Sequence, residues 1–276
     1  MCRQCLAAAP LTVPALDSRA KKTGARDLSS QRLIHLVAHR GNARECPENT
    51  LPAFRSALEL GVRFLELDVQ LSADHVPVVI HDPQLARTAG VAGSVFELAA
   101  SELTQIEVAE SARLGEKYRG THISLLSEVL KLLEGRPEVT IFVEIKRESL
   151  QQFSHDLVVS RVAEVIKPWR AQCVVISFDL AAIYRARQLG ELQIGWVLRK
   201  YDAHSQLKCE ALQPEYLFCD QLELPASGAL WRGPWRWVIY EVESLPAAQA
   251  LAERGANYIE SMAVRELVEA LRAQRP

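Results

Sequence analysis

The hydrophobic pattern divides the chain into an irregular N-terminal part and a regular remainder. Residues 1–30 are mainly Ala, Pro, Ser, Lys and Arg without a period, so we expect a flexible leader. From residue 31 onward, short apolar runs alternate with segments of helical periodicity. The run LIHLVAH (33–39) predicts a buried strand, and TLPAFRSALELG (50–61) predicts a helix that Thr50 caps and Gly61 ends.

Repetition of this strand–helix unit predicts the fold class. We interpret the alternating run 62–71 as a second strand and the segment 75–80 as its extension. Further strands are expected at residues 139–145, 172–177, 192–198, 215–219, 236–240 and 256–260, and helices at residues 124–134, 150–168, 179–190, 202–210, 244–254 and 262–273. Continuous Val, Ile and Leu runs are typical of parallel strands buried on both faces. The chain therefore predicts an α/β fold, a single (β/α)8 TIM barrel over residues 31–276.

Two details refine this prediction. The stretch 82–120 has no clear period and is expected to be a small insertion between the second and third units. A doubly wound open sheet is the alternative, but such a sheet usually has a glycine-rich loop after its first strand. The corresponding segment here, HRGNARECPENT (39–50), contains one glycine, which favours the barrel.

Composition and charge exclude several classes of protein. Of the 276 residues, 49% are hydrophobic, which is too many for a disordered chain. With 32 Lys+Arg against 34 Asp+Glu, the net charge of −2 gives no reason to expect a nucleic-acid partner. No apolar stretch reaches the roughly 18–20 residues of a membrane helix, so we expect no stable membrane insertion and a cytoplasmic location. The six cysteines are dispersed, and Cys2 and Cys5 lack the further ligands of a zinc site.

Acidic residues gather at the carboxyl ends of the first strands, where TIM barrels hold their active sites. Glu66 and Asp68 are two residues apart on one strand and therefore face the same side. Glu144 lies near the end of the next barrel strand. Three converging carboxylates suit a hard divalent cation, Mg²⁺ or Ca²⁺. The alternative is an ion-pair network in which Arg40 and Lys146 neutralise them without a metal.

Two histidines are expected beside these carboxylates. His39 and His81 each follow a predicted strand segment, and they suit a general acid and a general base on opposite sides of a phosphorus atom. Arg40 and Lys146 are then candidates to bind the phosphoryl oxygens, Arg through its planar fork and Lys as a point charge. The spacing does not assign acid and base between the two histidines.

These residues lie in motifs that resemble the glycerophosphodiester phosphodiesterase family. HRG and PENT within 39–50, ELD (66–68), HDPQLARTAG (81–90) and EIK (144–146) match the family's HRG, PENT, ExD, HD with L-x-R-T, and ExK elements. The resemblance implies a barrel with an insertion that hydrolyses small glycerophosphodiesters to sn-glycerol 3-phosphate and an alcohol. It implies acid and base roles for His39 and His81, metal ligation by Glu66, Asp68 and Glu144, and phosphate contacts for Arg40 and Lys146. Glu48, from PENT, is expected to orient Arg40 or the metal site.

The C-terminal third departs from the family pattern. Where the family has W-T-V-N, this chain has YEVE (240–243), and ESM (260–262) lies where the family has an I-T-D element. Candidate residues at the mouth, where the alcohol group of a substrate would lie, are Phe178, Trp196, Tyr240, Glu241 and Glu260. Aromatic faces together with acidic groups favour a cationic head group such as choline.

Two other functions stay open. Lysophospholipase D-like and phospholipase-like barrels also use two histidines and a metal, but they act on lipid phosphodiesters, and no apolar ramp is evident in this sequence. An inactive barrel that serves as a binding module would lack part of the catalytic set, which is complete here.

Overall fold

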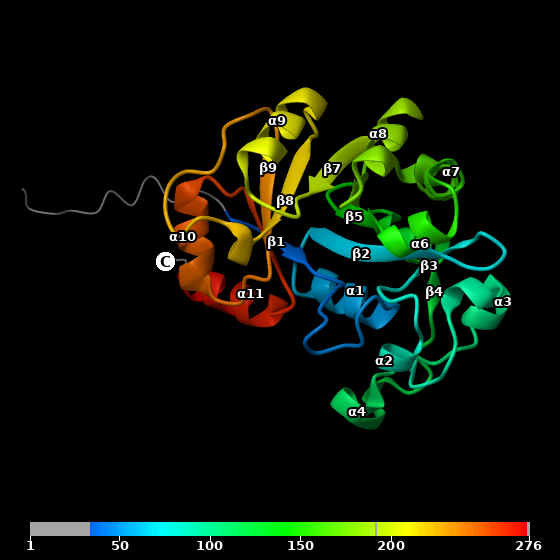
Figure 1. Ribbon diagram of the computed structural model, residues 1–276. Coiled ribbons are helices and arrows are strands. Elements are labelled where there is room, and N and C mark those ends of the chain that lie inside the picture. Colours follow the sequence, from blue (N-terminus) through cyan, green and yellow to red (C-terminus); the bar gives the residue numbers. More distant parts are fainter. Residues whose placement is uncertain (1–33, 191, 275–276) are drawn as a thin grey trace, which may run out of the picture. The chain divides into compact units, whose positions relative to one another are not determined.

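The computed structural model describes residues 34–190 and 192–274 (Figure 1). The predicted leader over residues 1–30, with Cys2 and Cys5, lies outside the described residues.

Eight parallel strands form a closed barrel in the described part of the chain. In barrel order they are β1 (His35–Ala38), β2 (Phe64–Leu71), β5 (Thr140–Ile145), β6 (Cys173–Ser177), β7 (Gln193–Val197), β8 (Tyr216–Asp220), β9 (Arg236–Tyr240) and β10 (Tyr258–Ser261). Each strand pairs with the next, and β1 closes the ring because it pairs with both β10 and β2. The predicted (β/α)8 barrel is therefore confirmed.

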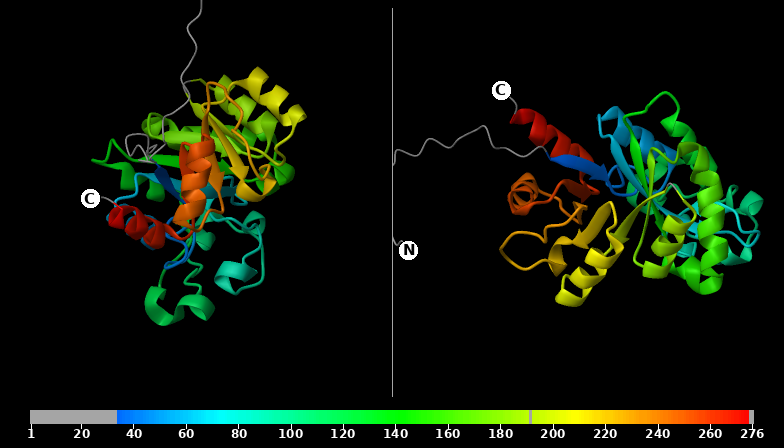
Figure 2. Two further views of the ribbon diagram at one scale, coloured as in Figure 1. Left: turned by 90° about the vertical axis from the view of Figure 1, so that its left-hand side faces the viewer. Right: turned by 90° about the horizontal axis from the view of Figure 1, so that it is seen from above.

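Helices follow most of the barrel strands and surround the barrel (Figures 1 and 2). They are α1 (Leu51–Glu59), α6 (Arg147–Gln152), α7 (His155–Ile166), α8 (Leu180–Gln188), α9 (Ala203–Leu212), α10 (Leu245–Arg254) and α11 (Val264–Ala273). The start of α1 is as predicted, since the Thr50 hydroxyl accepts a hydrogen bond from the Ala53 N–H. Among the described residues, no helix has the length and apolar character needed to cross a membrane.

Two predicted helices differ from the structure. The helix expected at 150–168 is divided into α6 and α7, because Ser154 has an extended backbone and caps α7 with its hydroxyl. The helix expected at 124–134 begins as the strand β4 (Ser124–Leu125) and continues as α5 (Leu126–Leu130).

The segment 75–80 is not an extension of β2. The chain reverses after Ser72, whose hydroxyl accepts the Val76 N–H, and His75 has a left-handed backbone with φ 62°. The following strand β3 (Pro77–Val79) then runs antiparallel to β2. The prediction was wrong because a hairpin and a continuous strand share the same alternating pattern.

An insertion lies between the second and third barrel units, as predicted, but it extends beyond the expected residues 82–120 at both ends. It contains β3, β4 and the short helices α2 (Ala86–Ala89), α3 (Ala100–Leu103) and α4 (Ser111–Leu114). Its apolar side chains form a small core of their own: Val78, Ile80, Leu85, Val95, Leu103, Val108 and Ile123. Because β3 pairs with β2, the insertion is anchored directly to the barrel.

The side chains that face the barrel axis change in character along each strand. Most of them are apolar and form one cluster inside the barrel, referred to below as the apolar floor: Val37, Phe142, Val174, Ile176, Val197, Tyr216, Phe218, Val238 and Tyr258. On β5 and β10 the residue two positions further along is acidic, with Glu144 after Phe142 and Glu260 after Tyr258, whereas on β6 the residue level with Glu144 is Ile176. The charged groups at the mouth therefore rest on a water-excluding layer.

Phe142 tests the importance of this floor. Its side chain is fully buried and its ring packs edge-on against Tyr216, Phe218 and Tyr258, with centroids 5.0, 5.1 and 6.3 Å away. We expect Phe142→Ala to lower the free energy of unfolding by about 3–5 kcal/mol in urea denaturation, because it leaves a cavity. Tyr184→Ala, at a side chain 56% exposed, is the control and should change it by less than about 0.5 kcal/mol. Equal effects of the two substitutions would contradict this role of the floor.

Candidate active site

The turn after β1 brings backbone groups toward the barrel axis. Arg40 and Gly41 both have left-handed backbones, with φ of 55° and 80°. A Cβ atom at position 41 would lie 2.7 Å from the Ala53 backbone, so the close packing against α1 requires glycine. In this turn the Arg40 N–H donates to Glu66 Oε2 at 3.0 Å. The turn thereby joins β1 to a carboxylate of β2.

The three carboxylates predicted to converge do so. Parallel pairing of β2 with β5 places Asp68 opposite Glu144. One oxygen from each of Glu66, Asp68 and Glu144 lies within 4.8 Å of the others. All three side chains are buried, so their mutual repulsion is weakly screened.

Two cations offset part of this charge. Arg40 Nε lies 3.1 Å from Asp68 Oδ2, and its Nη1 donates to Glu48 Oε1 at 3.0 Å. Lys146 Nζ lies 3.1 Å from Asp68 Oδ1 and donates to Glu144 Oε1 at 2.9 Å. Burial alone would raise the pKa of Asp68, but Lys146 and Arg40 outweigh it and hold that pKa well below its usual value. Asp68 is therefore ionised at neutral pH.

Glu66 is not satisfied by this ion-pair network. Its Oε1 is buried and has no hydrogen-bond partner. Burial, followed by the charges of Asp68 and Glu260, raises the pKa of Glu66 well above its usual value. The predicted ion-pair alternative thus accounts for Asp68 and Glu144 but not for Glu66. Three carboxylates with one unpaired buried oxygen fit a hard divalent cation.

The PENT segment supports the site from behind. Glu48 contacts Arg40, as expected. The neighbouring Asn49, which the sequence analysis did not single out, has a left-handed backbone with φ 58°. Its Nδ2 donates to Asp68 Oδ2 at 2.8 Å, and its Oδ1 accepts the Asp68 N–H at 3.1 Å. Asn tolerates this backbone better than most residues, which is the signal that could have identified it.

His39 lies among carboxylates. It is 8% exposed, with Nδ1 3.5 Å from Glu241 Oε1 and Nε2 3.6 Å from Glu260 Oε1. Burial, helped by the charge of Arg40, lowers the pKa of His39 to about 3. The imidazole is therefore neutral at physiological pH and has one nitrogen free to accept a proton or bind a metal.

His81 reaches the site from the hairpin rather than from a barrel strand. Gln70 Nε2 donates to the His81 carbonyl at 2.9 Å, which fixes the backbone after β3. The ring Nδ1 lies 2.5 Å from Asp82 Oδ1. Burial raises the pKa of Asp68 and of Glu144, and His81 is near enough to both carboxyls to act in the opposite direction; the pKa of Glu144 stays raised.

Arg87, in the insertion, connects the two histidine loops and was not singled out from the sequence. Its Nε donates to Asp82 Oδ2 at 2.5 Å. Its two Nη atoms donate to Glu48 at 2.9 and 2.7 Å. Glu48 in turn binds Arg40, so one chain of contacts runs from His81 to Arg40. The signal for Arg87 was its place in the L-x-R-T motif.

Of the five residues expected at the mouth, three are partly exposed and two are buried. Phe178 and Tyr240 are half-buried and pack against the barrel-interior cluster, and the Glu241 side chain is 43% exposed. The Arg199 guanidinium already lies over the Phe178 ring, 5.6 Å from its centroid. These three residues remain candidates for contact with a substrate.

Trp196 and Glu260 do not lie where they were expected. Trp196 is 5% exposed and packs in the core outside the barrel, because strand alternation turns residue 196 away from the axis. Glu260 lies at the same end of the barrel as His39 but is only 3% exposed, so it is buried there. Its burial follows from the inward-facing position of residue 260 on β10.

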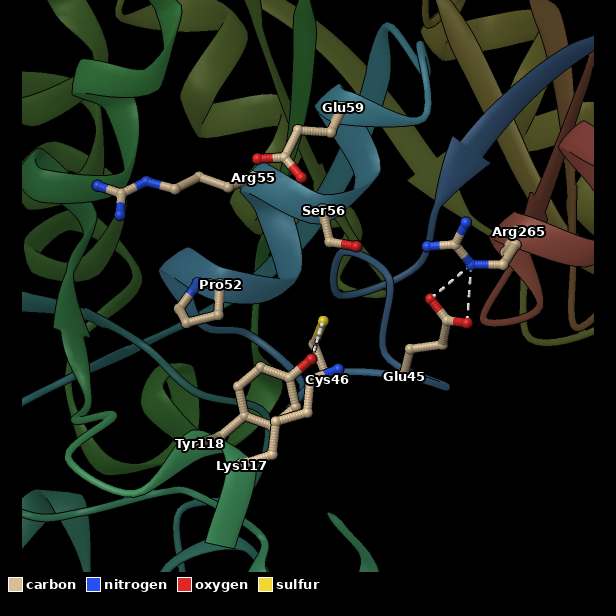
Figure 3. Close-up of a pocket in the computed structure, with 9 residues that line it drawn as sticks. All are labelled: Glu45, Cys46, Pro52, Arg55, Ser56, Glu59, Lys117, Tyr118 and Arg265. Atoms are coloured by element: carbon tan, nitrogen blue, oxygen red, sulfur yellow. Dashed lines mark hydrogen bonds and ion pairs between the residues drawn. The ribbon is translucent and has the colours of Figure 1, made fainter. Parts of the chain in front are cut away.

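A separate polar pocket of about 430 Å³ lies beside α1 (Figure 3). It is lined by Glu45, Cys46, Pro52, Arg55, Ser56, Glu59, Lys117, Tyr118 and Arg265. Arg265 forms an ion pair with Glu45 across one side, and Cys46 Sγ lies 3.1 Å from the Tyr118 hydroxyl. None of the predicted site residues lines this pocket.

Fold and site together define a class: a (β/α)8 barrel with clustered carboxylates, two cations and one histidine at the carboxyl ends of its strands and a second histidine from an inserted hairpin. The model of the glycerophosphoryl diester phosphodiesterase family matches residues 39–222, which is more than half of the chain. This chain therefore belongs to the glycerophosphoryl diester phosphodiesterase family.

Curated relatives agree with this assignment. A glycerophosphodiester phosphodiesterase of Caldanaerobacter subterraneus subsp. tengcongensis is 40% identical over 111 residues, covering 40% of this chain and 44% of the relative. Bovine glycerophosphodiester phosphodiesterase 1 is 30% identical over 155 residues, covering 56% of this chain and 46% of the relative. Mouse lysophospholipase D GDPD1 is 32% identical over 144 residues, covering 51% of this chain and 43% of the relative. The chain thus spans less than half the length of these relatives.

Solved structures share the fold. An Oleispira antarctica phosphodiesterase in complex with its product sn-glycerol-3-phosphate aligns with a TM-score of 0.76 and 24% identity, over 87% of this chain and 97% of that chain. The glycerophosphodiester phosphodiesterase of Thermotoga maritima aligns with a TM-score of 0.66 and 21% identity, over 87% and 99%.

Asn49 offers a test of the site geometry that needs no substrate. We expect Asn49→Ala to lower the free energy of unfolding by about 2–4 kcal/mol in urea, because it removes two buried hydrogen bonds to Asp68, one of them to a charged oxygen. Asn49→Asp should be more destabilising at pH 7, since it places a second carboxylate against Asp68. The difference between the two variants should shrink as the pH falls and one carboxyl takes up a proton. An aspartate that is tolerated better than alanine at pH 7 would contradict the described contact.

Proposed function

We propose that this protein is a metal-dependent phosphodiesterase that hydrolyses glycerophosphodiesters to sn-glycerol 3-phosphate and an alcohol. The observation that carries the proposal is the convergence of Glu66, Asp68 and Glu144 at one end of the barrel, with an unpaired Glu66 oxygen, between His39 and a second histidine loop. Membership of the family supports the reaction, and the product complex of the Oleispira protein supports the substrate class.

Glu66, Asp68 and Glu144 would hold the divalent cation, Mg²⁺ or Ca²⁺. When bound, it supplies a positive charge that orients the glycerol 2-hydroxyl and lowers its pKa. The role of the protein is to fix the three carboxylates in place. Asn49 holds Asp68 from one side and Lys146 bridges Asp68 and Glu144 from the other.

The two histidines would carry the protons. His39 lies beside Glu66 and would accept the proton of the 2-hydroxyl as that oxygen attacks phosphorus. His81 would donate a proton to the leaving alcohol, held in orientation by Asp82 and Arg87. The cyclic phosphate formed in this way would then be opened by water. Arg40 and Lys146 would offset charge on the phosphoryl oxygens.

The head group of the substrate would lie against Phe178, Tyr240 and Glu241. The acidic group and the two rings suit a cationic head group such as choline. Arg199 over the Phe178 ring would have to move aside for such a cation to stack there.

A lysophospholipase D activity is the second candidate. The similarity to mouse lysophospholipase D GDPD1 favours it, as does Leu222, which is 84% exposed just after β8. The catalytic groups would be the same, and the substrates would differ by one acyl chain. The third alternative, an inactive barrel that serves as a binding module, would lack part of the catalytic set, and all of those residues are present in this chain.

The central experiment is a coupled assay for glycerol 3-phosphate release over a panel of glycerophosphodiesters. We expect turnover in the presence of Mg²⁺ or Ca²⁺, its loss on addition of EDTA and its recovery when the metal returns. Turnover that is indifferent to chelation would contradict the metal site. Equal turnover of glycerophosphocholine and glycerophosphoinositol would contradict the cationic head group, and choline release from lysophosphatidylcholine instead would favour the second candidate.

Substitution of the two histidines tests their roles. His39→Ala and His81→Ala should each fold and each lose about 10²–10⁴-fold in turnover, which is the usual contribution of a general acid or base. His155→Ala is the matched control, since His155 is half-exposed and pairs with Asp179 outside the site. Near-normal turnover in either site variant would remove that histidine from the mechanism.

A further inference from the structure

Three buried side chains near the barrel axis have polar atoms without hydrogen-bond partners. These atoms are His39 Nδ1, Glu66 Oε1 and Glu260 Oε2, whereas the atoms that approach one another most closely are His39 Nε2, Glu66 Oε2 and Glu260 Oε1. His39 Nε2 lies 3.6 Å from Glu260 and 3.9 Å from Glu66, too far for a normal hydrogen bond. A buried carboxylate without a partner is costly, and in proteins such groups are paired or bind a metal. Among the described residues Glu260 Oε2 has no hydrogen-bond partner, and a bound cation would supply one.

The arrangement fits one metal ion. One donor atom from each of His39, Glu66 and Glu260 lies within 4.8 Å of the others. Zn²⁺ binds imidazole nitrogen and carboxylate oxygen at about 2.0–2.2 Å, so its ligands lie up to about 4.3 Å apart. A small rotation of the acidic side chains would bring all three into contact with one ion. Glu260 Oε2 has no hydrogen bond to oppose that rotation.

This group is distinct from the three-carboxylate cluster and shares only Glu66 with it. Its chemistry differs as well, because a nitrogen donor replaces one oxygen. Carboxylates alone favour Mg²⁺ and Ca²⁺, whereas imidazole with carboxylates suits Zn²⁺ and other transition ions. Glu260 also lies in the C-terminal part of the chain that departs from the family pattern.

We propose that His39, Glu66 and Glu260 form a second divalent-cation site that takes Zn²⁺ and inhibits the enzyme. The inhibition rests on the proposed function, in which His39 accepts a proton. An ion bound to Nε2 occupies the lone pair that would accept that proton. The catalytic cation on Glu66, Asp68 and Glu144 would activate, and the ion beside His39 would switch the base off.

Zinc stoichiometry tests the site without any substrate. The full chain, held in excess Mg²⁺, is dialysed against micromolar free Zn²⁺, and bound zinc is counted for the wild type, Glu260→Gln and Glu241→Gln. Glu241→Gln is the matched control, because Glu241 lies 3.5 Å from the other ring nitrogen of His39 and its substitution makes the same change in charge. Zinc held elsewhere is common to all three proteins and cancels in the comparison.

We expect Glu260→Gln to bind one Zn²⁺ fewer per chain and Glu241→Gln to bind as many as the wild type. Equal binding by all three proteins would overturn the proposal, and so would equal loss in both variants, which would indicate a general charge effect. Circular dichroism spectra of the two variants are compared with that of the wild type to check that each variant is folded. If Glu260→Gln is unfolded, anomalous scattering at the zinc edge from crystals of the wild type replaces it, and density away from His39 would overturn the proposal.

The inhibition is measured separately. Zn²⁺ added to the Mg²⁺-loaded wild type should abolish glycerol 3-phosphate release, and Glu260→Gln should require about 10–100-fold more Zn²⁺ for the same fractional loss. Glu260-dependent zinc binding without any turnover would leave the site standing and contradict the proposed function. Normal turnover without Glu260-dependent zinc binding would support the proposed function and overturn the zinc site.

Discussion

Repulsion among four buried carboxylates is the constraint on which this site depends. Glu66, Asp68, Glu144 and Glu260 all face the same end of the barrel, where little water screens them. Arg40 and Lys146 both form ion pairs with Asp68. Arg40 also contacts Glu48, and Lys146 also contacts Glu144. These ion pairs offset the charges of Asp68 and Glu144, which are two of the four carboxylates. Glu66 Oε1 and Glu260 Oε2 have no hydrogen-bond partner, and burial together with the neighbouring carboxylates raises the pKa of both groups. A bound cation would relieve this repulsion.

The fold maintains this arrangement in two ways. Below the charged groups, the apolar floor around Phe142 excludes water and fixes the strands, so that the carboxylates do not relax apart. Beside them, the hairpin and insertion hold a second layer of contacts in which Arg87 binds both Asp82 and Glu48. A rigid barrel thus supplies the carboxylates, and a smaller appended unit supplies the second histidine.

Much of the fold and part of the site could be predicted, and the limits have physical causes. The eight strands were found because burial on both faces leaves long apolar runs in the sequence. Glu66, Asp68 and Glu144 were placed together because a spacing of two fixes the face and parallel pairing fixes the level. The hairpin of β3 was missed because reversal of the chain leaves the alternation unchanged. Asn49 and Arg87 were missed because their importance lies in contacts with residues distant in sequence.

The sequence by itself determined the barrel, the alternation of side chains along its strands, and the residue types available at its carboxyl end. Local periodicity decides these features, since alternation and strand length are properties of neighbouring residues. Only the tertiary structure decided depth and partners. Trp196 and Glu260 both looked like mouth residues, yet one faces the helices and the other lies buried against His39. Closure of the barrel brings β10 beside β1, and a contact that joins the two ends of a chain has no local signature.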